Sequence, residues 1–377
     1  MTTVIRAAEP RDLIAYAWYV MGFRPRESLV VVGLRGERRR TGVVARIDLP
    51  DRRSLVREVD AVVRLLERDR DDACLLLVVS DEQQVGDRLP HEDLVEGFAE
   101  LLTVDRKIDV VDALLVDRQT YRSYLCGEPL CCPPEGTPLD AVHASRVAAA
   151  MVLDGRCVVD DESDLVADVE PAGGLARGEA PLVLPRGRPG RGRRRAAFDR
   201  WCADLDARAD APDRPEELLA AIRADLATRD AVLLTLVPGS LDVARGLVDG
   251  RPFPRDGFAG LRRRPDPEVV AVGNRLLAAL ARRAPRGRRA EPLALLGWLG
   301  WWSGDCVRGR LLAERALAEE PGHRLAGLAS ALLAAAVPPP WTRAGRTVSD
   351  GRRDAVADGE TDRDADADAD PDDAADG

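Results

Sequence analysis

The sequence predicts an N-terminal α/β domain, an all-helical second domain and an acidic tail. Up to residue 169, apolar and alternating segments interleave with helical periodicity, which indicates a mixed sheet with crossover helices. Residues 170–195 are rich in Gly, Pro and Arg, which is typical of a linker. From 196 to 340 the apolar residues recur at helical spacing. Residues 341–377 change to an Arg/Gly and then Asp/Ala composition, too polar to fold, so we expect a disordered tail there.

The stretch from Gly22 to Pro50 predicts a β-hairpin. Its first strand holds the apolar run 29–32, which suits a strand buried on both faces. From Val43 the chain alternates, so Arg46 and Asp48 share the face opposite the apolar residues. A surface ion pair is the simpler interpretation of these two residues. If the strand borders a cleft, they instead form a ligand site whose further members are Ser28 and Arg146.

Periodicity predicts the other elements of both domains. In the first domain we expect helices at 9–21, 54–68, around 94–102 and 139–153, and strands at 74–79, 110–116 and 120–126. In the second domain we expect helices around 198–205, 218–226, 231–237, 241–248, 268–282, 292–302 and 307–319.

The last two of these helices match one tetratricopeptide unit. Small or apolar residues stand where two such helices pack closely, at Leu293, Leu296, Gly297, Gly309, Ala313, Ala316 and Pro321. Gly300 departs from the pattern, and no neighbouring repeat is evident, although arrays need three or more units. An ordinary helical hairpin is therefore the simpler interpretation. The functional alternative is a partner-binding surface for a protein, with Trp301 as an exposed anchor.

A cysteine-rich loop contains the most unusual local chemistry of the chain. Cys126, Cys131 and Cys132 precede two prolines, and His143 follows at a distance. These four residues are a candidate zinc site, although the spacing differs from that of zinc fingers. A redox pair of Cys126 and Cys131 is a second alternative. The third is a set of packed thiols in a loop stiffened by proline.

The charge distribution limits the classes of partner. The net charge is −10, but residues 350–377 carry twelve acidic residues against three arginines, so the rest of the chain is nearly neutral. This argues against a protein that coats nucleic acid. Residues 186–195 hold six arginines without interleaved aromatics, and a solvated linker is a simpler interpretation than a phosphate-binding segment.

The chain shows no secretory signal and no apolar run approaching the roughly 20 residues of a membrane helix. Its seven cysteines are an odd number and are scattered, which is typical of reduced thiols in a cytosol. We therefore expect a soluble, cytoplasmic protein that does not enter a membrane.

Several blocks, taken in order, resemble the bacterial family known as domain of unknown function 4192. The matching residues are Gly22-Phe23, Pro25, Ser28-Leu29-Val30, Arg46, Asp48-Leu49-Pro50, Tyr124, Cys126, Cys131-Cys132-Pro133-Pro134, Gly136, Pro138-Leu139, Ser145-Arg146, Leu295-Leu296, Trp298, Trp302, Gly304-Asp305, Ala316-Leu317 and Pro321. The resemblance extends from about Ala8 to Pro339. It implies a boundary and a shape but no particular activity.

Known catalytic signatures are missing from the sequence. Lys107, the single lysine, follows no glycine loop, so there is no P-loop, and neither G-x-S-x-G nor H-E-x-x-H occurs. Together with the tryptophan-rich helical end (Trp298, Trp301, Trp302), this favours a non-catalytic binding or regulatory protein. The alternative is an enzyme, or a redox or metal protein, that uses the cysteine loop.

Overall fold

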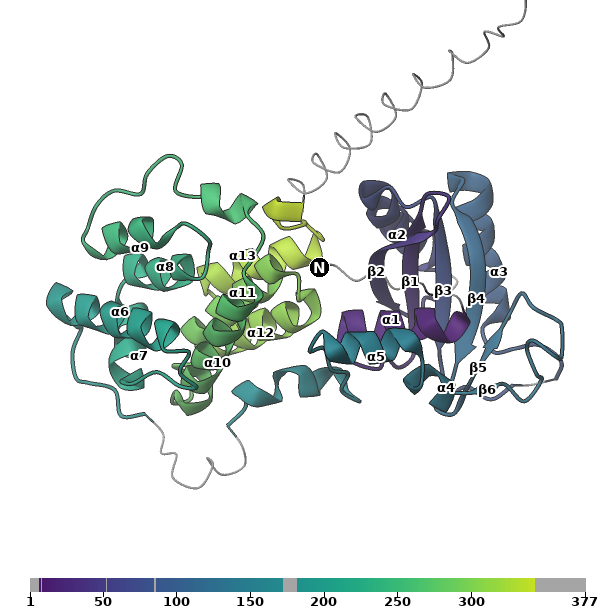
Figure 1. Ribbon diagram of the computed structural model, residues 1–377, viewed down its shortest axis with the longest axis horizontal. Helices are drawn as coiled ribbons and strands as arrows, with labels where there is room; N and C mark the ends of the chain where they lie inside the picture. Colours follow the sequence, from purple (N-terminus) through teal and green to yellow (C-terminus); the bar gives the residue numbers. More distant parts are fainter. Residues whose placement is uncertain (1–6, 8, 52, 85, 172–181, 343–377) are drawn as a thin grey trace, which may run out of the picture. The chain divides into compact units, whose positions relative to one another are not determined.

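A computed structural model describes residues 7, 9–51, 53–84, 86–171 and 182–342 (Figure 1). The chain divides into two compact units, Met1–Ala167 and Asp168–Gly377. The sheet and the helices of the first unit and the helices of the second agree with the fold class predicted from the sequence.

The first unit is built on a mixed six-stranded sheet. Its strands are β1 (Ser28–Arg35), β2 (Arg40–Asp48), β3 (Ala73–Val79), β4 (Asp109–Val116), β5 (Thr120–Ser123) and β6 (Thr137–Pro138), in the order β2-β1-β3-β4-β5-β6. β1 pairs antiparallel with β2, which confirms the hairpin, and also with β3. Among the sheet strands that the structure describes, only the pair β3 and β4 runs parallel, and these two are joined through a helix, as a parallel pair requires.

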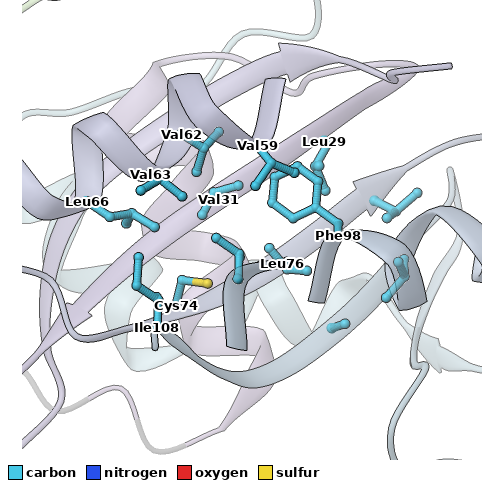
Figure 2. Packing of buried hydrophobic residues seen from close by; sticks show 14 of the residues in the cluster. Leu29, Val31, Val59, Val62, Val63, Leu66, Cys74, Leu76, Phe98 and Ile108 are labelled. Carbon is cyan, nitrogen blue, oxygen red and sulfur yellow. The ribbon is translucent and has the colours of Figure 1, made fainter. Parts of the chain in front are cut away.

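One face of this sheet is covered by α2 (Leu55–Asp69), α3 (Glu92–Glu100) and the π-helical turn η1 (Leu101–Asp105). Figure 2 shows apolar side chains of α2 and α3 meeting those of the strands. Phe98, Leu66 and Leu76 are fully buried in this cluster. Alternate strand residues, such as Val30 and Val32, are equally buried, so the sheet is covered on its second face too.

The second face involves α1 (Pro10–Met21), which packs against β1 and β2 and against α5 (Arg146–Leu153). The prediction of a single helix at 139–153 is wrong. The chain forms α4 (Asp140–His143), breaks, and starts again as α5. The physical reason is Ser145, whose extended backbone places its hydroxyl oxygen to accept a hydrogen bond from the Ala148 N–H.

The second unit is helical. It contains α6 (Arg191–Asp206), α7 (Pro215–Ala224), α8 (Leu226–Thr235), α9 (Leu241–Val248), α10 (Pro267–Arg283), α11 (Ala290–Ser303), α12 (Cys306–Glu319) and α13 (Arg324–Ala334), with 3₁₀ turns η2 (Glu162–Val169, across the unit boundary) and η3 (Ala259–Arg262). The last helix, α13, was not expected from the sequence.

The linker predicted at 170–195 includes residues that belong to a helix. Residues 191–195 form the first turns of α6, and two of their arginines have partners within the helical unit. Arg194 lies 3.5 Å from the carboxylate of Asp225, and Arg195 lies 3.0 Å from that of Asp199. Part of the arginine run is therefore structural and not a solvated linker. Residues 172–181 of the expected linker lie outside the described residues.

The end of the helical unit holds the tryptophan cluster. The expectation that Trp301 is exposed is wrong: the residue is 6% exposed, and its indole N–H donates a 2.7 Å hydrogen bond to the Val337 carbonyl oxygen. The chain after α13 covers the ring. Trp341, expected in the tail, likewise donates from its indole to the Trp302 carbonyl oxygen at 2.7 Å. The rest of the tail that we expected to be disordered, residues 343–377, lies outside the described residues.

Among the helices of the described residues, none combines the length and the apolar character needed to span a membrane.

Candidate functional site

Three strand ends converge at one edge of the sheet. The parallel strands β3 and β4 both end there, at Val79 and Val116, and the antiparallel β1 begins there, since Ser28 pairs with Val79. The chain segments next to these ends therefore lie close together. Such an edge, outside the carboxyl ends of parallel strands, is where ligands bind in open α/β sheets.

Two adjoining cavities occupy this edge. The first has a volume of about 300 Å³, with Trp18, Pro25, Val79, Val116 and Leu139 as its apolar lining and Arg24, Arg26, Glu27, Ser80, Asp81, Asp117, Arg118 and Asp160 as its polar lining. The second, of about 360 Å³, shares Arg24, Arg118 and Leu139 and adds Gln119, Pro138, Asp140 and His143. We call the two cavities together the carboxyl-edge groove. Their size suits a small molecule.

Arginines that line both cavities are paired with acidic residues that water reaches. Arg118 lies 2.8 Å from the carboxylate of Asp81, and its own side chain is 74% exposed. Arg24 lies 3.3 Å from the carboxylate of Asp160, with its guanidinium 5.5 Å from the centre of the Trp18 ring. Exposed ion pairs of this kind are weak, so an anionic ligand can replace either acid at small cost.

The loops of the groove are fixed by hydrogen bonds to Glu27. The buried Ser80 hydroxyl donates to the Glu27 carboxylate at 3.0 Å, and the Asp81 N–H donates to it at 3.1 Å. Glu27 has a φ of 41°, in the left-handed region that side chains disfavour. Residues are held in such conformations where the surrounding structure determines them, and often at binding sites. His91, with its Nε2 3.1 Å from the Ser80 Oγ, extends this network.

The residues predicted to bind a ligand lie in different places. Ser28, Arg46 and Asp48 come together: Arg46 donates to the Ser28 hydroxyl and to the Asp48 carboxylate, both at 2.9 Å. Ser28 in turn donates to the Arg26 carbonyl oxygen at 2.6 Å. They do not line the groove but support the backbone of Arg26, which does. Arg146, exposed at the start of α5, is not among the lining residues.

A second candidate site is the thiol cluster, formed by Cys126, Cys131 and Cys132. Their sulfur atoms all lie within 4.8 Å of one another. His143, predicted as a fourth ligand, does not belong to this group and lines the groove instead, with its ring 5.8 Å from that of Trp18. The sequence showed that the three cysteines lie in one loop, but it could not show where the side chain of His143, in the following helix, would lie.

Electrostatics distinguishes the thiols from one another. The pKa of Cys126 is lowered, first by the backbone N–H of Glu128 and then by the thiol of Cys132, which both donate toward its sulfur. The pKa of Cys132 is raised to about 12, mainly by burial and then by its hydrogen bonds to the other two thiols. Cys126 is thus the first of this pair to ionise.

Sequence reasoning missed the groove itself. Arg24, Arg118 and Asp81 stand at turns between elements, and no motif connects them along the chain. The available signal was the position of polar residues directly after the apolar runs of β3 and β4, at Ser80-Asp81 and Asp117-Arg118. That pattern marks the carboxyl ends of two strands, but their parallel pairing was needed to bring them together.

Fold and site together define a two-unit protein: an α/β unit with a polar groove at the carboxyl edge of its sheet, followed by a helical unit. The chain belongs to the family described as Domain of unknown function (DUF4192), whose model matches residues 10–340. That match covers both units and agrees with the resemblance found in the sequence. Comparisons with curated proteins and with solved structures gave no significant match.

Proposed function

We propose that this is a binding or regulatory protein without catalytic activity, and that its N-terminal unit binds a small anionic ligand in the carboxyl-edge groove. The observation that carries the proposal is the placement of Arg24 and Arg118, which line both cavities of the groove at the carboxyl edge of β3 and β4.

The chemistry of the groove suits a carboxylate or a phosphate group. A guanidinium offers several donors in a planar fork that matches either anion. The ligand would replace Asp81 at Arg118, or Asp160 at Arg24, and would rest its apolar part on Val79, Val116 and Leu139. A cavity with an apolar lining and a few polar groups is the usual form of a small-molecule site.

Binding without catalysis is supported by the burial of Ser80, the serine that lines the first cavity. Ser80 is 2% exposed, and its hydroxyl donates to the Glu27 carboxylate. A serine nucleophile needs a base that accepts its proton and an exposed oxygen that reaches the substrate. Glu27, and His91 with its Nε2 3.1 Å from the Ser80 oxygen, could each accept the proton. Burial of Ser80 keeps its oxygen away from a substrate in the cavity, so the residue suits a structural role that holds the loop.

Isothermal titration calorimetry of the full chain tests the proposal, with inorganic pyrophosphate and succinate as probes at fixed ionic strength. We expect at least one probe to bind, and Arg118→Ala and Arg24→Ala each to weaken it about tenfold, which corresponds to 1.4 kcal/mol. Arg57→Ala is the matched control, because Arg57 is 78% exposed on α2 and pairs only locally with Glu58. An equal loss in the control, or no binding of either probe, contradicts the proposal.

For the helical unit, we propose that α11 and α12 form a tetratricopeptide-like hairpin that binds a protein partner. Close helix packing supports this, since Gly297 lies against the backbone of Ala313, and α13 packs against both helices as a following repeat would. Trp301 is not the anchor, because the chain after α13 covers it.

A photo-crosslinking residue tests this at Leu328, which is 53% exposed on α13, against a matched position at Val56, which is 59% exposed on α2. A protein crosslinked from position 328 and not from 56, in the cells that produce the chain, supports partner binding by the helical unit. Equal crosslinking at both positions, or none, contradicts it.

We further propose a cytoplasmic location. All seven cysteines lie in described residues and are free thiols there, which suits a reducing compartment. Labelling of the thiols in intact cells, before and after lysis, measures their redox state in place. Disulfide-linked Cys157 and Cys306, both exposed, would contradict the assignment.

A further inference from the structure

We propose that Cys126, Cys131 and Cys132 form a three-coordinate site that binds one Cu(I) ion through their sulfur atoms. The site is separate from the carboxyl-edge groove, and none of its three residues lines the groove. The proposal therefore goes beyond the binding function proposed above.

The spacing of the sulfurs suits a single soft ion. Three sulfurs around one ion at a bond length of about 2.3 Å, the length known for zinc thiolates, lie about 4 Å from one another. The three sulfurs of the cluster already lie within 4.8 Å of one another. Small side-chain rotations are therefore enough to bring all three onto one ion.

Backbone hydrogen bonds bring the thiols together without help from a metal. The Cys126 N–H donates to the Ser123 hydroxyl oxygen at 3.0 Å, which fixes the start of the loop. The N–H groups of Cys131 and Cys132 both donate to the Glu128 carbonyl oxygen, at 3.0 and 2.7 Å. This turn folds the chain back, so that two adjacent cysteines can both approach Cys126.

The far end of the loop is fixed as well. The Arg122 guanidinium donates to the Pro134 carbonyl oxygen at 3.0 Å. Gly136 has a φ of 86° and lies so close to Thr120 that a Cβ there would be 2.7 Å from the threonine Cβ. Both ends of the loop are thus tied to β5 and its surroundings, and the site is partly formed before an ion binds. Such preorganisation lowers the cost of binding.

The ligand set favours Cu(I) over other ions. Thiolates are soft ligands and select Cu(I) or Zn²⁺ over Mg²⁺ and Ca²⁺, which prefer oxygen. A structural Zn²⁺ needs four ligands. Within the part of the chain that the structure describes, no further His, Cys, Asp or Glu joins the three cysteines. Three sulfurs complete the shell of a three-coordinate ion and leave Zn²⁺ one ligand short.

Binding is a ligand exchange without a redox step. The three thiols release their protons to solvent, the chelator or solvent ligands that carried the ion leave it, and three copper–sulfur bonds form. Copper stays in the monovalent state in which it is supplied. Metal binding to thiols therefore releases protons and weakens as the pH falls. The exposed Cys131 is the point at which the ion reaches the loop from solvent.

The test is an anaerobic titration of the reduced full chain with Cu(I), against a chromophoric Cu(I) chelator as competitor, followed by copper X-ray absorption. We expect one Cu(I) per chain in a shell of three sulfurs. Each variant Cys126→Ser, Cys131→Ser and Cys132→Ser should lose more than about 100-fold in affinity, because even loss of an outer-shell partner costs roughly 10- to 100-fold. Cys157→Ser is the matched control, since Cys157 is an exposed free thiol outside the cluster.

Circular dichroism establishes that each variant is folded, and Cys131→Ser is the decisive one because its side chain is exposed. Cu(I) binding that survives in Cys131→Ser overturns the proposal, as does an equal loss in Cys157→Ser. So does tighter binding of Zn²⁺ than of Cu(I), with a nitrogen or oxygen as fourth ligand. None of these three results affects the groove, which is tested with different residues and a different probe.

Discussion

The Asp71 carboxylate accepts a hydrogen bond of 3.1 Å from the backbone N–H of Val43. This contact joins the start of β3 to the edge strand β2 from inside the protein, because the Asp71 side chain is fully buried. Gly33 and Gly42 make room for it: a Cβ at either position would lie 2.0 Å from a carboxylate oxygen. The Arg35 Nε is 3.6 Å from the same carboxylate.

The first prediction concerns the pH dependence of this acid. Burial is the main cause that raises the pKa of Asp71 from 3.8 to about 6. The hydrogen bond from Val43 lowers this pKa, and the charge of Asp69 raises it. Between these values the folded state binds more protons than the unfolded state, so stability falls as the pH rises from about 4 to above 6. The loss attributable to Asp71 is about 3 kcal/mol at pH 7.5.

Asp71→Asn tests this, because the amide is neutral at every pH and can still accept from Val43. We expect wild type and variant to be closest in stability at pH 3.5, below the unfolded-state pKa, and the variant to become more stable than wild type as the pH rises to 7.5. Urea-dependent hydrogen exchange of peptides from β1 and β2, compared at the same pH, measures the difference. If the stability of wild type instead increases relative to that of the variant as the pH rises, the ionised carboxylate is a net stabilising partner of Arg35.

The second prediction concerns the space beside Asp71. Gly42→Ala places a methyl group on the carboxylate, so either the acid or the hairpin must shift, and we expect a loss of about 1–3 kcal/mol. Gly127→Ala is the control, because nothing lies within 4 Å of a Cβ there and its φ is not in the left-handed region. In the Asp71→Ala background the Gly42→Ala change should cost much less. Equal costs in both backgrounds would mean that something other than the carboxylate is displaced.

Local patterns explain how much of the first unit could be predicted. The apolar run of β1 and the helical stripe of α2 each record burial directly in the sequence. The alternation in β2 does not, because its residues 41–47 are half-buried on both faces. Asp71 shows where such reasoning fails: an acid in a charged run before a strand, here residues 69–72, looks solvent-exposed. Its burial depends on two glycines that are nine residues apart along the hairpin, and only the pairing of β1 with β2 brings them together.

The third prediction concerns the contact between α11 and α12. A Cβ on Gly300 would lie 2.6 Å from the Cα of Gly309, so backbone meets backbone and no side chain can yield. Gly300→Ala should therefore destabilise the helical unit by about 1–3 kcal/mol or more, despite the better helix propensity of alanine. Urea unfolding followed by tryptophan fluorescence measures this, because five of the six tryptophans lie in this unit.

Gly327→Ala is the matched control for this substitution. Gly327 also lies within a helix, α13, but nothing lies within 4 Å of a Cβ there. We expect this change to stabilise the unit slightly, by up to about 1 kcal/mol, through helix propensity alone. If both substitutions stabilise the unit, α11 and α12 do not approach each other as closely as the structure shows.

The helical end also shows why the exposure of Trp301 was predicted wrongly. Trp298, Trp301 and Trp302 occur on an almost wholly apolar helix, where periodicity cannot tell which side faces solvent. The covering segment, residues 335–342, follows a helix that the sequence analysis did not include. Burial of Trp301 is therefore a consequence of tertiary packing and leaves no mark in the local pattern.

The last prediction concerns the bond between Trp301 and Val337. Trp301→Phe removes the indole N–H and leaves the Val337 carbonyl oxygen without that donor, which should cost about 1–3 kcal/mol in addition to the lost ring volume. Trp298→Phe removes the same atoms from a ring of similar burial, which stacks on Trp302 at 5.9 Å. The difference between the two variants, measured by urea unfolding, therefore isolates the hydrogen bond. We expect Trp301→Phe to be the less stable by about 1–3 kcal/mol, and hydrogen exchange to increase in the chain after α13. Equal stability would mean that this segment does not depend on the Trp301 indole.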